Sequence, residues 1–142
     1  MAVIRPTMPL PSIGWKEHVS FPRLKLGPIV AKIDTGARTA ALHADSFEVA
    51  GRRVRFVIGH KRLAAPLAGF KRVKSSNGIS ELRPVIRVTI QLGSRQFKAE
   101  VTLTQRGDMG VPLLLGRNTI SGKYLVHPSR SFLLSRKEKL HP

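Results

Sequence analysis

Apolar and polar residues alternate with period two over much of this chain. Residues 97–104, FKAEVTLT, show the pattern clearly, with apolar Phe97, Ala99, Val101 and Leu103 separated by polar neighbours. Alternation of this kind is typical of strands with one buried face, and turn residues rather than long helical patterns separate the alternating runs. The pattern therefore predicts an all-β domain, either a small barrel or a sandwich.

The turn residues divide these runs into hairpins. Residues 46–58 are expected to form two strands around Ala50-Gly51, and residues 67–92 a hairpin that turns at Asn77-Gly78. A further turn is expected at Gly93-Ser94.

Shorter apolar runs predict the remaining elements. The run IVAKI is expected to be a strand that ends at Asp34, and PLLLG at 112–116 and SFLLS at 131–135 are expected to be buried strands. Short helices are expected only at Thr39 to Ala44 and for a turn or two after Gly116.

The chain has the length of one domain, with 142 residues. Residues 1–12, which contain three prolines, are expected to form an extended leader, residues 13–135 the domain, and residues 136–142 a basic tail. The N-terminus lacks the apolar core of a signal peptide, and no run approaches the roughly 20 apolar residues of a membrane span. We expect a cytoplasmic protein without membrane association.

Positive charge dominates the composition, with 25 Lys and Arg against 8 Asp and Glu, a formal net charge of +17. Such a field attracts polyanions, which include nucleic acid, a ribosomal surface and acidic peptides. With one Trp and one Tyr, a platform for stacking single-stranded bases is poorly supported. A charged surface that serves solubility alone explains the composition equally well.

The segment VAKIDTGARTAAL, residues 30–42, carries the candidate chemistry. Asp34 closes an apolar strand, Gly36 permits close approach of a backbone, and a small residue, Ala37, follows. A carboxylate held in a partly dry site can act as a general acid or base. From this segment alone, an Asx-type turn in which Asp and Thr bond their own backbone is the simpler interpretation.

Further segments change this balance. The chain contains AKIDTGARTAALHA, then ELRPVI, then TLTQRGDMGVPLLLGR and finally LVHP. This order resembles the retropepsins, and in particular a bacterial retropepsin-like branch formerly labelled ATP-dependent zinc proteases, often encoded beside a ribosomal-protein glutamate ligase. The resemblance covers about residues 13–135.

The resemblance implies a small closed acid-protease barrel with a flap hairpin and one or two short helices. It also implies an aspartic endopeptidase in which Asp34 is the acid or base, Thr35 braces the loop, and Gly36 admits the substrate backbone. Substrate-binding residues are expected at Ala37 and Arg38, at the flap residues Asn77, Gly78 and Ile79, and at Arg83 and Arg106. Structural support of the site is expected from Leu115, Gly116 and Arg117.

One copy of Asp-Thr-Gly per chain has a consequence for assembly. Aspartic peptidases use two carboxylates that share one proton, so the resemblance implies a homodimer with one Asp34 from each subunit. The expected substrate is an acidic, glutamate-rich peptide tail such as that on a modified ribosomal protein, with an association to the ribosome or to a glutamate ligase. Where retroviral enzymes carry an acidic residue after the Ala, this chain has Arg38.

Two rival interpretations follow from the residues. The sequence lacks the His-Glu-x-x-His pattern of zinc proteases and a Walker-type loop, so neither metal nor another cofactor is expected. A lone His43 is more typical of a structural role than of a ligand. A basic binding module of retropepsin fold, docking on RNA or the ribosome without cleavage, remains the alternative.

Overall fold

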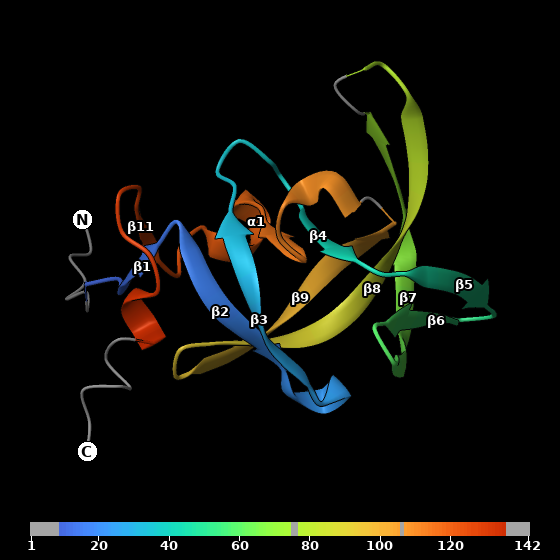
Figure 1. Ribbon diagram of the computed structural model, residues 1–142, viewed down its shortest axis with the longest axis horizontal. Coiled ribbons are helices and arrows are strands. Elements are labelled where there is room, and N and C mark those ends of the chain that lie inside the picture. Colours follow the sequence, from blue (N-terminus) through green and yellow to red (C-terminus); the bar gives the residue numbers. More distant parts are fainter. Residues whose placement is uncertain (1–8, 75–76, 106, 136–142) are drawn as a thin grey trace, which may run out of the picture.

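The barrel consists of six strands in the order β2, β3, β10, β4, β9 and β8, and β8 pairs again with β2. A computed structural model describes residues 9–74, 77–105 and 107–135 (Figure 1). The barrel strands are β2 (Lys16–Phe21), β3 (Leu26–Ile33), β4 (Ala40–His43), β8 (Ser80–Leu92), β9 (Arg95–Thr104) and β10 (Leu113–Leu115). Closure occurs at one point, where Ser20 pairs with Gln91. The predicted all-β barrel is therefore confirmed.

Other strands extend or flank this barrel. β7 (Lys61–Lys74), β6 (Arg53–Ile58) and β5 (Ser46–Ala50) continue the sheet beyond β8, and Figure 1 shows β5 and β6 outside the barrel. A separate parallel pair joins β1 (Ser12–Gly14) to β11 (Leu125–His127). Short helical segments are η1 (Pro22–Leu24), η2 (Gly107–Met109) and α1 (Arg117–Ile120), so the predicted turn of helix after Gly116 is confirmed.

Apolar residues from every barrel strand meet in one core. Val101 and Leu103 of β9 are fully buried, as are Leu113 and Leu115 of β10. Burial of such side chains contributes about 1.5 to 3 kcal/mol each. Thr102 is also buried, and its hydroxyl donates a hydrogen bond to the carbonyl of Ala40 at 2.9 Å. The buried hydroxyl therefore has a hydrogen-bond partner.

The predicted hairpins occur where the turn residues place them. Ala50 pairs with Arg53 across Gly51, and Leu92 pairs with Arg95 across Gly93-Ser94. Both Gly51 and Gly93 have positive φ, of 63° and 66°, which explains glycine at these positions. The β7–β8 hairpin is also present, but Lys74 pairs with Ser80, so its loop is longer than the two-residue turn expected at Asn77-Gly78.

Two predicted elements are wrong. Thr39 to Ala44, expected to be a helix, contains strand β4, because Ala40–His43 pairs in parallel with β9 and antiparallel with β10 inside the core. Tertiary pairing here overrides the helical preference of an alanine-rich segment. Residues 131–135, expected to be a strand, pair with no strand among the described residues, and residues 133–135 are helical instead.

A buried carboxylate holds this last segment instead. Glu17 is fully buried and accepts hydrogen bonds from the amides of Leu133 at 2.9 Å, Leu134 at 3.4 Å and Gly14 at 2.7 Å. Leu133 and Leu134 begin the helical segment, where amides lack an acceptor within the helix, and the Glu17 carboxylate accepts from them. The predicted leader and basic tail fall largely on residues 1–8 and 136–142, which lie outside the described residues.

No helix in the described part of the chain is both long and apolar enough to cross a membrane.

Candidate active site

Asp34 lies at the point where strand β3 leaves the barrel. The loop of residues 34–39 joins β3 to β4, and β10 enters between these two strands, parallel to β3 and antiparallel to β4. A segment that comes 80 residues later in the chain thus fixes both ends of the loop. Asp34 is partly buried, whereas Thr35 and Gly36 are exposed.

Hydrogen bonds shape the loop around the carboxylate. The Asp34 amide donates to the carbonyl of Leu115 at 2.9 Å, which ties the loop to β10. The Gly36 amide donates to Asp34 Oδ1 at 3.1 Å, and the Ala37 amide donates to the Asp34 carbonyl at 3.1 Å. Asp34 therefore has the Asx-type bond of a turn and also presents its carboxylate at an exposed loop.

Helix α1 donates hydrogen bonds to the same loop. The amides of Arg117 and Asn118 donate to the carbonyls of Ala37 at 2.8 Å and Arg38 at 2.9 Å. The Arg117 side chain reaches further along the loop, where Nη1 donates to the Thr35 carbonyl at 3.0 Å. The helix thereby fixes the loop through three backbone carbonyls.

Gly116 allows this close approach. A Cβ at position 116 would lie 2.6 Å from the Thr39 carbonyl oxygen, 2.7 Å from the Arg38 carbonyl carbon and 2.7 Å from the Thr39 amide nitrogen. All three atoms belong to the backbone and cannot move aside by a change of rotamer. Glycine is thus required sterically, although its φ of −87° suits any residue.

The β7–β8 hairpin rises on the same side of the barrel as the 34–39 loop (Figure 1). Its described tip residues, Asn77, Gly78 and Ile79, are all exposed, and Asn77 Oδ1 accepts the Ile79 amide at 3.2 Å. Phe70 and Leu82 are 53% and 54% exposed on the hairpin. The hairpin thus exposes apolar side chains to solvent.

The three cations expected near the cleft differ in their surroundings. Arg38 is exposed on the 34–39 loop, and in the described part of the chain it forms no ion pair. Arg83 is buried, with its Nη2 3.4 Å from Glu81 Oε2, and its Nε has no hydrogen-bond partner among the described residues. Arg106 lies outside the described residues.

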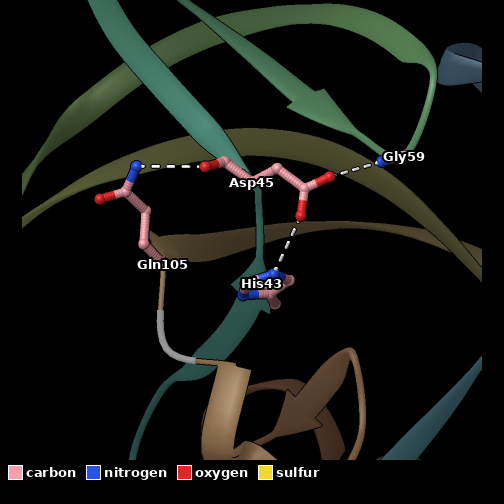
Figure 2. Close-up of polar contacts among 4 residues, drawn as sticks. All are labelled: His43, Asp45, Gly59 and Gln105. Atoms are coloured by element: carbon pink, nitrogen blue, oxygen red, sulfur yellow. Dashed lines mark hydrogen bonds and ion pairs between the residues drawn. The ribbon is translucent and has the colours of Figure 1, made fainter.

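His43 takes part in a separate network of polar contacts with Asp45, Gly59 and Gln105 (Figure 2). It ends β4, at the opposite end of that strand from the 34–39 loop, and its Nε2 lies 3.3 Å from Asp45 Oδ1. Asp45 Oδ2 accepts the Gly59 amide at 2.7 Å, and the Asp45 carbonyl accepts from Gln105 Nε2 at 3.2 Å. This network joins β4 to the β6–β7 turn and has no part in the candidate site.

The described residues contain no group of three or more His, Asp or Glu side chains arranged to hold a metal ion.

The fold and the loop together define the class of protein. A closed barrel presents one Asp-Thr-Gly loop, held by a strand and a Gly-Arg-Asn helix start, and carries a long hairpin, which is consistent with a small retropepsin-like barrel. Residues 12–137 match the family described as "Retropepsin-like aspartic endopeptidase RimB", and the chain belongs to this RimB-like family.

Several relatives carry a different activity in their names. The chain is 38% identical over 140 residues to a "Probable alpha-L-glutamate ligase" of Shewanella pealeana, covering 90% of this chain and 31% of that protein. A protein of the same name from Desulfotalea psychrophila is 33% identical over 142 residues, covering 89% of this chain and 30% of that protein. The chain thus spans about a third of the length of the curated relatives it matches.

A solved structure shares the fold over nearly the whole chain. A Legionella pneumophila protein of unknown function superposes with a TM-score of 0.73 at 29% identity, covering 87% of this chain and 98% of that chain.

Two residues that the sequence did not single out for the site also make contacts at the loop. Asn118 bonds the Arg38 carbonyl, and Thr39 packs over Gly116. Asn118 directly follows Gly116 and Arg117, which the motif identified, so its position in the sequence could have indicated a role at the loop. Thr39 could not be found in this way, because its contact with Gly116 depends on the insertion of β10.

Proposed function

We propose that this chain is an aspartic peptidase that acts as a homodimer, with Asp34 of each subunit forming the catalytic pair. One observation carries the proposal: Asp34 stands on a loop that β10 and α1 hold through four hydrogen bonds. Three join backbone to backbone, from the Asp34 amide to the Leu115 carbonyl and from α1 amides to the Ala37 and Arg38 carbonyls, and in the fourth the Arg117 side chain donates to the Thr35 carbonyl. Such bracing suits a carboxylate whose position must be reproducible. A loop that serves only as a turn does not need this support.

The chemistry then requires two chains. The sequence contains a single Asp-Thr-Gly and no Asp-Ser-Gly, so the second carboxylate comes from a twofold partner. Two carboxylates about 3 Å apart share one proton, since both cannot ionise at that distance. The ionised Asp34 removes a proton from water, which attacks the peptide carbonyl, while the protonated Asp34 donates its proton to the carbonyl oxygen. Transfer of a proton to the amide nitrogen then releases the amine.

The hairpin has a supporting role in this scheme. Closure of its tip over a bound peptide would exclude water and supply backbone hydrogen bonds through Asn77, Gly78 and Ile79. Phe70 and Leu82 would lose their exposure in the closed complex, which contributes binding energy.

The proposed substrate is a peptide rich in glutamate. The net charge of +17 favours an acidic ligand, and Arg38 is exposed on the 34–39 loop, where it forms no ion pair with any described residue. Relatives named as probable alpha-L-glutamate ligases contain a segment similar to this chain, which supports a substrate made by a glutamate ligase, such as a glutamate-extended ribosomal protein. Association with the ribosome or with the ligase, in the cytoplasm, follows from such a substrate.

Cleavage of a glutamate-tailed peptide by the native protein and by Asp34→Asn tests the proposal. Asn keeps the shape of the side chain and removes the titratable carboxylate, so we expect cleavage by the native protein alone, with a loss of at least about 10³-fold in the variant. Thr35→Ser is the matched control, because it retains the hydroxyl, and should keep most of the activity. Undiminished cleavage by Asp34→Asn would place the chemistry elsewhere.

The rival function is a basic module that binds RNA or the ribosome without cleavage, and the charge alone favours it as much as it favours the peptidase. Tight ribosome binding by both Asp34→Asn and the native protein, with no cleavage by either, would support the module.

A further inference from the structure

The outer face of the β7–β8–β9 sheet carries two adjoining hollows that the candidate active site does not use. The first has a volume of about 460 Å³ and lies between β7, β8, β9 and α1. The second, of about 310 Å³, lies between β6, β7, β8, β9 and η1. Arg87 and Lys98 line both hollows, so the two adjoin at these side chains, and we treat them together as one groove. Both volumes fall in the range of about 300 to 1,000 Å³ typical of ligand sites.

This groove is strongly positive. Six of its lining residues are cations and one is a carboxylate, Glu100, which lies 3.3 Å from Arg87. The cations are Arg23, Arg53, Lys71, Arg87, Lys98 and Lys123. We name it the basic groove. Five positive charges are left in excess of the single carboxylate, which a polyanion can neutralise.

The strand register sets the spacing of these cations. Arg87 stands directly opposite Glu100 in the β8–β9 pair, so Lys98 lies diagonally across from Arg87 on the same face. Diagonal neighbours are separated by about 7 to 8 Å at their Cα atoms. In an extended peptide, side chains on one face repeat every two residues, about 6.6 Å. Carboxylates on one face of an extended glutamate run are therefore spaced about as Arg87 and Lys98 are.

The first hollow begins where the active-site loop ends. Thr39 and Asn118 line it, and the Asn118 amide bonds the Arg38 carbonyl within that loop. Asp34 and Thr39 are five residues apart, so their Cα atoms are separated by at most about 18 Å. A peptide of about six extended residues is long enough to reach from Asp34 into the basic groove.

The aromatic content of the groove favours a peptide over nucleic acid. Phe97 is the single aromatic residue among those that line the two hollows. It packs against the core, and Lys123 Nζ lies 4.9 Å from its ring centroid. A ring in contact with the core and with Lys123 offers little area for stacking bases, which is what single-stranded nucleic acid requires.

We propose that the basic groove is a docking site for the acidic tail of the substrate, separate from the catalytic loop, and that Lys98 and Lys123 determine specificity there. The inference rests on the proposed function for its substrate class. It adds a second point of attachment within about six residues of the cleaved bond. Affinity for an acidic peptide then depends on tail length, because a short peptide cannot contact both sites.

The test measures binding of fluorescein-labelled hexaglutamate to the full chain with Asp34→Asn, by fluorescence anisotropy at low salt. Reversal of two groove charges, Lys98→Glu with Lys123→Glu, should raise the Kd at least about tenfold. The matched control is Arg52→Glu with Arg62→Glu, which makes the same change of charge at exposed residues outside the groove. The control should raise the Kd less than about threefold, and Lys98→Arg with Lys123→Arg should leave it near the starting value.

Equal losses in the groove and control variants would overturn the proposal, because the whole surface rather than the groove would then attract the peptide. Tighter, groove-dependent binding of hexauridylate would also overturn it, in favour of a nucleic-acid surface. A thermal melt of each variant identifies any loss caused by unfolding.

Kinetics separate this inference from the proposed function. If the native protein cleaves tailed peptides, the groove variant should raise KM for tails longer than about six residues and leave kcat unchanged. Groove-dependent binding without any cleavage would refute the peptidase and retain the docking site. Cleavage with no effect of the groove variant on KM would retain the peptidase and refute the docking site.

Discussion

Substitution of Gly116 by alanine tests the link between β10, α1 and the active-site loop. The added Cβ would lie 2.6 Å from the Thr39 carbonyl oxygen and 2.7 Å from two further backbone atoms. Ordinary contacts between such atoms begin near 3.5 Å, so the 34–39 loop must move by about 1 Å. Overpacking of this kind costs about 1 to 3 kcal/mol, and we expect the upper part of that range because the atoms are backbone.

The assay is thermal unfolding combined with amide hydrogen exchange. At this chain length 1 kcal/mol corresponds to about 3 to 5 °C, so the variant should melt roughly 6 to 15 °C below the native protein. The amides of Arg117 and Asn118, which donate to the Ala37 and Arg38 carbonyls, should exchange faster. Any cleavage activity should fall by about 100-fold, because a displacement of 1 Å misplaces the Asp34 carboxylate.

Gly107→Ala is the matched control. Among the described residues other than its chain neighbours, no heavy atom lies within 4 Å of a Cβ at position 107, and Gly107 has no positive φ, so the stability should change by no more than about 0.5 kcal/mol. A Gly116→Ala variant with the native melting temperature and unchanged exchange at Arg117 and Asn118 would refute the packing argument.

Two further outcomes follow from buried polar groups. Glu17→Ala should lower the free energy of unfolding by about 2 to 4 kcal/mol in a denaturant titration, since it leaves the amides of Gly14 and Leu133 without an acceptor, whereas Glu48→Ala at an exposed ion pair should change it by less than about 0.5 kcal/mol. Burial raises the pKa of Tyr124 above 10.0, an effect that Arg95 partly opposes. The neutral phenol therefore contributes stability that is fully present below about pH 10 and is lost as pH rises through the folded-state pKa. Tyr124 is the single tyrosine, so phenolate absorbance follows it alone, and Tyr124→Phe should remove this alkaline loss. An unshifted absorbance titration, or a loss of stability on alkalinisation that is the same in Tyr124→Phe, would contradict this.

Local patterns were sufficient to predict most of the barrel. The alternation in residues 97–104 and the glycines at 51 and 93 depend on the backbone and its nearest neighbours, and the structure confirms the strands and turns they indicated. The loop at Asp34 was found because the Asp-Thr-Gly motif is contiguous in the sequence.

Features that depend on distant segments could not be predicted in this way. Ala40–His43 is a strand because β9 and β10 pair with it, and nothing within the segment itself indicates those partners. Residues 131–135 are held by Glu17, which lies more than 110 residues earlier in the chain. The basic groove combines cations from η1, α1's C-terminal side and four strands, each of which looks like an ordinary surface charge in the sequence.

The central claim is that two chains together form one catalytic site, and a subunit-mixing experiment tests it most directly. Native protein is held at a concentration where activity per mole has stopped rising, and Asp34→Asn is added. If mixed dimers form at random and are inactive, an equal amount of the variant should halve the cleavage rate, and a threefold excess should leave about one quarter. A rate that does not change as Asp34→Asn is added would show that one chain suffices, and would contradict the account.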